Sequence, residues 1–229
     1  MPTIELDTRN CLVADPGNLL VGADYSQIES RVIATLADEQ TMIQSFIDGR
    51  DIHKTVASSL WGTPYDDVKP DQRSIAKNCG YAMMYGSGPK KLALMADIPV
   101  PEAKAVIDLF YETFPKLKLY QKSLSKMEVI VTPFGRELPI DRARRYAATN
   151  YMIQSTARDL FVIGGVRIIE AGYGQCLWLP IHDEWILNVA EEHAEEVAAE
   201  LTEIMYIDFY GTPIIAEGVV LGESWRKAD

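Results

Sequence analysis

Apolar residues in this chain occur in two patterns, short continuous runs and runs with helical spacing. The first continuous run, residues 19–23, ends at Asp24 and predicts a buried strand. Residues 26–36 follow with apolar positions three and four apart, behind a serine suited to open a helix. The pattern therefore predicts a strand followed at once by a helix, with Asp24 at the junction.

The middle of the chain is dominated by helical spacing. The periodicity predicts helices at residues 40–47, 51–60 and 72–85, another after Pro101, and a long one over 142–171. Gly and Pro mark a loop over 62–70, and a short strand is expected at 129–131 before a turn at 133–135.

Near the end of the chain the pattern returns to strands. Residues 176–181 and 185–189 are apolar runs flanking His182, Asp183 and Glu184, which predicts a hairpin with this polar triplet as its turn. An acidic helix over 191–207 and a strand over 214–221 follow. The expected fold class is α+β, an antiparallel sheet covered by helices with a helical insertion.

Composition limits the class of protein. With 229 residues, 48% hydrophobic and 24% charged, the chain can bury a core in one or two domains. It contains no apolar run of the ~20 residues that span a bilayer and no signal-peptide pattern, so we expect no membrane partner and a cytoplasmic location. Cys11, Cys79 and Cys176 are far apart and are expected to be small core residues.

The net charge of −11 is unevenly distributed. Residues 69–145 carry 14 basic and 8 acidic side chains, whereas the rest of the chain carries 8 basic and 25 acidic ones. A basic middle with acidic ends suits a protein that holds a polyanion on one face and metal ions on another. An ordinary solvated basic face is the alternative.

Asp24 and Asp183 are candidate metal ligands. Each ends or interrupts an apolar strand, so sheet pairing can bring both carboxylates to one edge. Two adjacent carboxylates favour hard cations such as Mg²⁺. The alternative is structural, because Ser26 and Glu29 have the spacing of a helix capping box and Asp183 suits a hairpin turn.

Four side chains recur every four residues in the helix predicted over 72–85. Arg73, Lys77, Tyr81 and Tyr85 therefore share one helix face. Cations followed by aromatic rings along one stripe offer phosphate ligands and stacking surfaces, which favours a nucleotide site. The alternative is an ordinary surface helix whose cations extend to solvent.

These residues together resemble the family A DNA polymerases of the bacterial DNA polymerase I type. Residues 24–29 with Arg31 are similar to the family's first motif, the helical stripe ending in Tyr85-Gly86 to its second, and residues 182–184 to its third. Similarity to secondary signatures extends over residues 51–53, 135–136, 150–154 and 222–225. The resemblance implies a palm at residues 1–37 and 127–229, with helical fingers at 38–126.

The resemblance also implies a role for each matching residue in template-directed transfer of dNTPs to a primer. Two Mg²⁺ ions, with Mn²⁺ as an alternative, would be held by Asp24, Asp183 and the Tyr25 carbonyl, with Glu184 supporting the site. The residues implied at the incoming dNTP are Arg73, Lys77, Tyr81, His53, Glu29, Gln27 and Tyr25. Those implied at primer-template DNA are Tyr85, Gln154, Asn150, His182 and Arg31.

The chain departs from the family pattern at Ala82, where Gly is usual, and at Tyr146, where Arg is common. It also begins just before the first motif, so we expect a fragment or split subunit without thumb or exonuclease domains. Such a chain would need a thumb- or exonuclease-containing polypeptide, or self-association. A single-subunit RNA polymerase or reverse transcriptase is one alternative, and a non-catalytic DNA-binding subunit is another.

Overall fold

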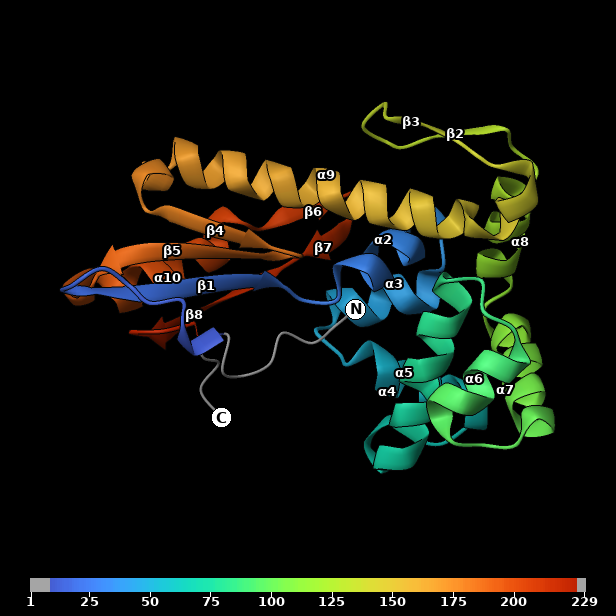
Figure 1. Ribbon diagram of the computed structural model, residues 1–229. Helices are drawn as coiled ribbons and strands as arrows, with labels where there is room; N and C mark the ends of the chain where they lie inside the picture. Colours follow the sequence, from blue (N-terminus) through green and yellow to red (C-terminus); the bar gives the residue numbers. More distant parts are fainter. Residues whose placement is uncertain (1–8, 226–229) are drawn as a thin grey trace. The chain divides into compact units, whose positions relative to one another are not determined.

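A computed structural model describes residues 9–225 and divides them into two compact units (Figure 1). The sheet unit comprises residues 9–28, 158–208 and 213–225. The helical unit comprises residues 29–157 and 209–212. None of the helices in residues 9–225 has the length and apolar content needed to cross a bilayer.

The sheet unit is built on four antiparallel strands in the order β4-β5-β1-β8. Their bounds are β1 Asn18–Tyr25, β4 Leu177–Ile181, β5 Glu184–Ala190 and β8 Ala216–Gly222. Strands β5 and β1 each have a neighbour on both sides, and four consecutive residues of β1, Leu20–Ala23, are buried. The sheet therefore assembles strands that are more than 150 residues apart in the sequence.

Helix α9 spans Ala148–Glu170, and its C-terminal part belongs to the sheet unit. That part lies along one face of the sheet (Figure 1). The rings of Phe161 on α9 and Trp185 on β5 stack with centroids 4.5 Å apart and an interplanar angle of 3°. The indole Nε1 of Trp185 also donates to the Phe161 carbonyl oxygen at 3.1 Å. Buried ring stacking with a satisfied indole N–H holds α9 to this face.

Helix α10, Ala194–Ile204, packs against β8 and β1. The approach is closest at Gly218, where a Cβ atom would lie 1.9 Å from the carbonyl oxygen of Ala198. Only glycine fits there, because the obstructing atom belongs to helix backbone and cannot rotate away.

Gly218→Ala should therefore destabilise the fold. The added methyl group would push α10 away from β8. Because such overpacking is destabilising, we expect the free energy of unfolding to fall by about 1–3 kcal/mol. Denaturant unfolding followed by circular dichroism measures this change. Gly88→Ala is the matched control, since a Cβ there meets nothing within 4 Å; equal stability of the two variants would contradict the close approach.

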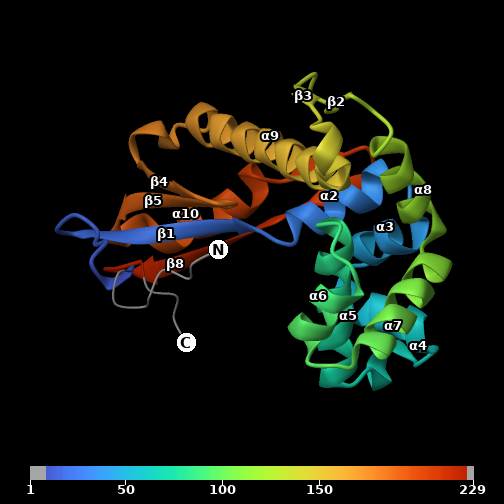
Figure 2. The ribbon, with the colours of Figure 1, turned by 45° about the vertical axis from the view of Figure 1, so that its right-hand side comes forward.

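The helical unit contains most of the helices of the described chain. Their bounds are α2 Ile28–Leu36, which starts at the last residue of the sheet unit, α3 Gln40–Ile47, α4 Ile52–Trp61, α5 Pro70–Met84, α6 Pro89–Ala96, α7 Val100–Thr113 and α8 Pro115–Leu124. Helix α5 packs against α4, α6 and α7, and these four lie side by side in Figures 1 and 2. The start of α4 lies against the stripe of α5, because Asp51 pairs with Arg73 and the His53 ring lies 6.1 Å from that of Tyr81.

A second core of the helical unit lies beneath a small hairpin. Strand β2, Val129–Val131, pairs with β3, Glu137–Pro139, and the buried Ile130 packs with Leu124, Ala148 and Met152. The remaining short elements are β6 Ile207–Phe209, β7 Thr212–Ile214, and the 3-10 turns η1 Tyr65–Asp67, η2 Arg142–Ala147, η3 Tyr173–Gln175 and η4 Glu191–His193.

The predicted order of strands and helices is largely confirmed, with corrections. The helix expected over 142–171 begins as a 3-10 turn, since Arg144 leaves helical geometry at φ −123°, and α9 starts only at Ala148. The helix expected over 191–207 is likewise shorter. Helices α6 and α8 were not predicted, although each begins at a proline, a residue favoured at the first helical position.

Two predictions about individual residues were wrong. Glu184 belongs to strand β5 rather than to the turn, because His182 at φ 54° lets the chain reverse within two residues. Cys11 is exposed and Cys176 is half-buried, whereas Cys79 is buried as expected. The palm and fingers ranges implied by the family resemblance remain predictions.

Candidate active site

Asp24 and Asp183 lie at the same end of the sheet. Asp24 is the second-last residue of β1, and its antiparallel partner across the ladder is Glu184, the residue that follows Asp183. The backbone N–H of Tyr25 donates to the Asp183 carbonyl oxygen at 3.1 Å, which ties the end of β1 to the β4–β5 turn. Strand pairing alone thus brings the two aspartates together across 159 positions of sequence.

The carboxylate side chains of Asp24, Glu184 and Glu217 share one face of the sheet. Glu184 and Glu217 are the partners of Asp24 on its two sides, and directly opposed residues point the same way. Trp185, the next residue, points the other way, toward α9. The three acids line a cavity of about 370 Å³ on the face opposite to α9.

Gly22 makes room for one of these acids. A Cβ at Gly22 would lie 2.6 Å from Oε1 of Glu184 and 3.0 Å from Cδ1 of Leu221. The Glu184 side chain, only 6% exposed, therefore extends over the backbone of β1 rather than into solvent. The sequence patterns did not identify Glu217 as a site residue. Pairing the last predicted strand with the first in antiparallel register would have placed it opposite Asp24.

The donor set at this end of the sheet suits a hard divalent cation. Carboxylates are the ligands that Mg²⁺ prefers, and such sites use one or two protein carboxylates completed by water and substrate phosphates. Within residues 9–225 no group of three or more Asp, Glu, His or Cys side chains is gathered closely enough to hold an ion. A site built on two aspartates and a backbone carbonyl is compatible with that arrangement.

Tyr25 can contribute only its backbone to such a site. Its ring is 1% exposed, and its hydroxyl donates to the carbonyl oxygen of Met205 at 2.9 Å. Burial raises the pKa of this phenol far above its usual range. The side chain thus belongs to the core beneath the sheet.

The stripe predicted in the helical unit lies on α5 and its C-terminal cap. Arg73, Lys77 and Tyr81 lie within α5, and Tyr85 caps its end. Lys77 is exposed and Arg73 is partly exposed, so both cations are accessible to an anion. The first half of the stripe is therefore available to phosphate and the second half to a ring or sugar.

His53, from the first turn of α4, lies next to this stripe. Its ring centroid is 6.1 Å from that of Tyr81, and the residue is 8% exposed. Burial lowers the pKa of His53, and the nearby charges of Arg73 and Lys77 lower it further against the opposing effect of Asp51. His53 is therefore neutral at pH 7 and offers a hydrogen bond rather than a fixed charge.

Asp51 connects α4 to α5. One carboxylate oxygen accepts from the backbone N–H groups of His53 at 2.8 Å and Lys54 at 3.1 Å, which caps α4. The other oxygen accepts from Nε and Nη2 of Arg73 at 2.8 and 2.7 Å. The sequence reading recognised Asp51 as part of a motif but gave it no role.

Glu29, Tyr85 and Gln154 come together in the helical unit. The Tyr85 hydroxyl donates to Oε2 of Glu29 at 2.9 Å and also exchanges a side-chain hydrogen bond with Gln154. Burial, with the nearby Glu29 carboxylate, raises the pKa of Tyr85 to about 12. Gln27, between Ser26 and α2, has a left-handed backbone at φ 55°, and α2 begins only at Ile28.

The other predicted DNA-contacting residues differ in accessibility. Arg31 is 4% exposed, with its guanidinium 4.5 Å above the ring of Phe46, and burial lowers its pKa to about 10. It can support a site but offers little surface to a ligand. His182 is exposed in the β4–β5 turn, and Asn150 is partly exposed in the first turn of α9.

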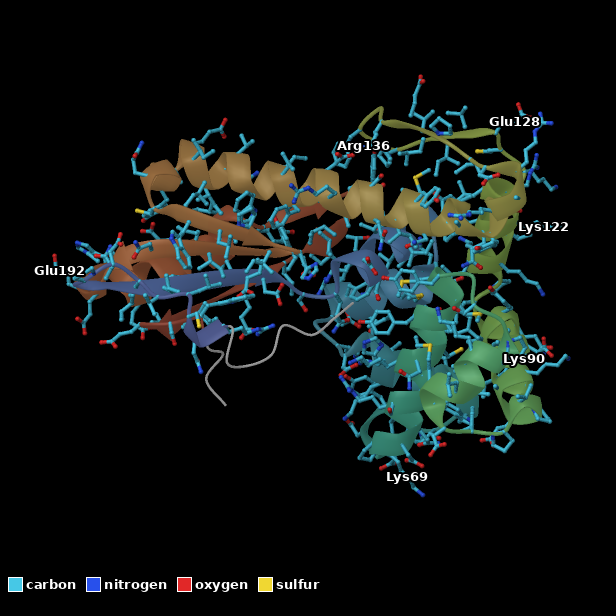
Figure 3. The ribbon with its side chains drawn as sticks, viewed as in Figure 1. Lys69, Lys90, Lys122, Glu128, Arg136 and Glu192 are labelled. Atoms are coloured by element: carbon cyan, nitrogen blue, oxygen red, sulfur yellow. The ribbon has the colours of Figure 1, made fainter. Side chains whose placement is uncertain are left out.

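The basic side chains of residues 69–145 are spread over the helical unit. Lys69 precedes α5, Lys90 lies on α6, Lys122 on α8 and Arg136 in the β2–β3 connection (Figure 3). These four cations therefore come from four different segments of the unit.

Comparison with known proteins assigns the family. A sequence model of DNA polymerase family A matches residues 3–227. A DNA polymerase of Mycobacterium phage D29 is 37% identical over 90% of this chain and 34% of its own length. The thermostable DNA polymerase I of Thermus aquaticus is 34% identical over 96% of this chain and 28% of its own length.

A solved structure has the same fold. The POL domain of Pol1 from M. smegmatis, in complex with DNA primer-template and dNTP, is similar with a TM-score of 0.86 and 28% identity, over 100% of this chain and 44% of that one. The chain spans about a third of the length of the curated relatives that it matches. On its sequence and its fold, this chain belongs to DNA polymerase family A.

Proposed function

We propose that this chain carries the nucleotidyl-transfer centre of a template-directed DNA polymerase. The observation that carries the proposal is the strand register, which sets Asp24 beside the turn that holds Asp183 on an open face of the sheet. Family membership favours a DNA polymerase over the single-subunit RNA polymerase and reverse transcriptase alternatives.

In the proposed reaction the primer 3′-oxygen forms a bond to the α-phosphorus of a dNTP, and the bond from that phosphorus to the bridging oxygen breaks to release pyrophosphate. Asp24, Asp183 and the Tyr25 carbonyl would hold two Mg²⁺ ions, or Mn²⁺ ions in their place. Such a pair, when bound, would stabilise the charge on the attacking and leaving oxygens. Glu184, held over Gly22, adds negative charge beside Asp24 and would orient this site.

The α5 stripe would bind the triphosphate and the sugar. Arg73 offers guanidinium donors to phosphate oxygens, and His53 offers a neutral hydrogen-bonding ring. Lys77 would donate a proton to the pyrophosphate as the P–O bond breaks. Tyr81 and Gln27 would contact the remainder of the nucleotide.

Template and primer would be held by Tyr85, Gln154, Asn150 and His182, with Arg31 supporting them from within the helical unit. The direct test is primer extension with Mg²⁺ and dNTPs, with the chain alone and with added thumb- and exonuclease-containing polypeptide of a relative. Mg²⁺-dependent, template-matched addition supports the proposal. DNA binding without any addition under either condition would leave only the non-catalytic alternative.

Glu29 should select against ribonucleotides. Its carboxylate is fixed by the Tyr85 hydroxyl, so it can crowd a ribose 2′-hydroxyl. Glu29→Ala should raise the ribonucleotide-to-deoxynucleotide ratio of kcat/KM by roughly ten- to a hundredfold, the scale on which a pocket discriminates one small group. Tyr85→Phe is the companion variant, since it keeps the ring and releases the carboxylate; it should give a smaller increase. Unchanged discrimination in Glu29→Ala would remove this role.

A further inference from the structure

Asp51 is held on all sides within the helical unit. Its backbone N–H donates to the Tyr65 hydroxyl at 2.9 Å, its Oδ1 caps α4, and its Oδ2 receives two N–H groups of Arg73. The aromatic ring of Tyr65 is itself flanked by the cationic groups of Arg50 and Lys54, at 5.4 and 5.3 Å from its centroid. A carboxylate fixed through both oxygens and through its backbone is a rigid anchor.

Arg73 depends on this anchor for its orientation. The guanidinium is planar and presents five donors, of which Asp51 occupies one on Nε and one on Nη2. That edge-on pairing fixes the plane and leaves the opposite edge, with Nη1, for another anion. The side chain is 40% exposed, so without the pair it would sample many rotamers in solvent.

We infer that Asp51 is a positioning residue for triphosphate binding, which presents the Arg73 guanidinium edge-on and sets His53 beside it through the cap on α4. The inference rests on the proposed function of Arg73 and His53 and names the residue that arranges them. Asp51 would not bind phosphate itself, because an ionised carboxylate donates no hydrogen bond and both of its oxygens already accept from the protein.

Removing Asp51 has two opposing effects on nucleotide affinity. Loss of a negative charge near the site favours binding of the triphosphate. Release of Arg73 opposes binding, because the long side chain must then be ordered, at a cost in conformational entropy, each time the nucleotide binds. The charge effect acts between partly exposed groups and is weakened by salt, whereas the ordering cost is not. The ordering cost should therefore dominate at physiological ionic strength.

Asp51→Ser separates the two functions of the carboxylate. Serine is a good helix cap and preserves α4, but its side chain is too short to reach Arg73. We expect its KM for dNTP to rise about tenfold while kcat changes less than about threefold, the pattern of lost binding that is shared by ground and transition states. The increase should grow between low and high salt.

Two further variants decide how Asp51 acts. Lysine has no planar guanidinium to orient. In an Arg73→Lys background, Asp51→Ser should therefore have little added effect on nucleotide affinity. A full tenfold loss in that background would mean that Asp51 acts through α4 alone and would overturn the inference. Asp48→Ser is the matched control, because Asp48 also faces an arginine, Arg50, but at 3.8 Å on the surface. It should leave KM unchanged.

Calorimetric titration of each variant with Mg²⁺ and a non-hydrolysable α,β-imido deoxynucleoside triphosphate keeps this test independent of turnover. A wild-type chain that binds the analogue but extends no primer would contradict the proposed function and still measure the effect of Asp51. Normal or tighter analogue binding by Asp51→Ser, with an otherwise active enzyme, would overturn the inference alone.

Discussion

Asp24→Ala and Asp183→Ala should each lower the rate of nucleotide addition by roughly a thousandfold or more. Each removes an acid proposed to hold metal ions that supply several kcal/mol of charge stabilisation in the transition state, and each 1.4 kcal/mol corresponds to a factor of ten. Neither change removes buried apolar area, so the free energy of unfolding should change by less than about 1 kcal/mol. Single-turnover primer extension with saturating Mg²⁺ measures the rate, and denaturant unfolding measures the stability.

The control for these variants lies in the same cavity. Glu217 faces Asp24 across β1 and β8 but is not among the proposed ligands, so Glu217→Ala removes one negative charge from the same surface. It should slow addition by less than about tenfold. If Asp24→Ala slowed addition no more than Glu217→Ala does, the loss would reflect general electrostatics and the two-aspartate site would be wrong.

Lys77→Ala should lower the rate of the chemical step by about 10²–10⁴-fold, the usual contribution of a general acid. Lys77→Arg is the informative partner. Arginine keeps the positive charge but holds its proton too tightly to release it. It should therefore restore the KM for dNTP toward the wild-type value while leaving kcat low.

Rapid-quench measurement at saturating dNTP separates the chemical step from nucleotide binding. Recovery of both kcat and KM by Lys77→Arg would show that Lys77 acts only as a cation. The exposed position of Lys77 on α5 makes either substitution compatible with folding, so a loss of rate can be assigned to chemistry.

Local sequence patterns were sufficient for the parts of the site that lie within one element. The strand ending at Asp24 and the four-residue stripe from Arg73 to Tyr85 follow from the two periodicities of side chains, which depend only on backbone geometry. The turn at Asp183 followed from polarity alone, since a polar triplet between two apolar runs disfavours a continuous strand. Its length was predicted one residue too long, because the left-handed conformation of His182 leaves no mark on hydropathy.

Contacts between distant segments could not be predicted in this way. Three contacts join residues that lie far apart in the sequence and share no periodic spacing. They are the strand pairing of Asp24 with Glu217, the hydrogen bond between Glu29 and Tyr85, and the ion pair between Asp51 and Arg73. The interruption of helical geometry at Arg144 was also not predicted, since arginine and alanine favour helix.

The sequence by itself therefore determined the family, the order of most elements and the residue types that nucleotide transfer requires, because these are written in short motifs and local periodicity. Tertiary structure alone decided which face of the sheet carries the carboxylates, which side chains orient Arg73 and Glu29, and why Gly218 must be glycine. The reason is physical: register and close packing depend on atoms that come within a few ångströms only after the chain has folded.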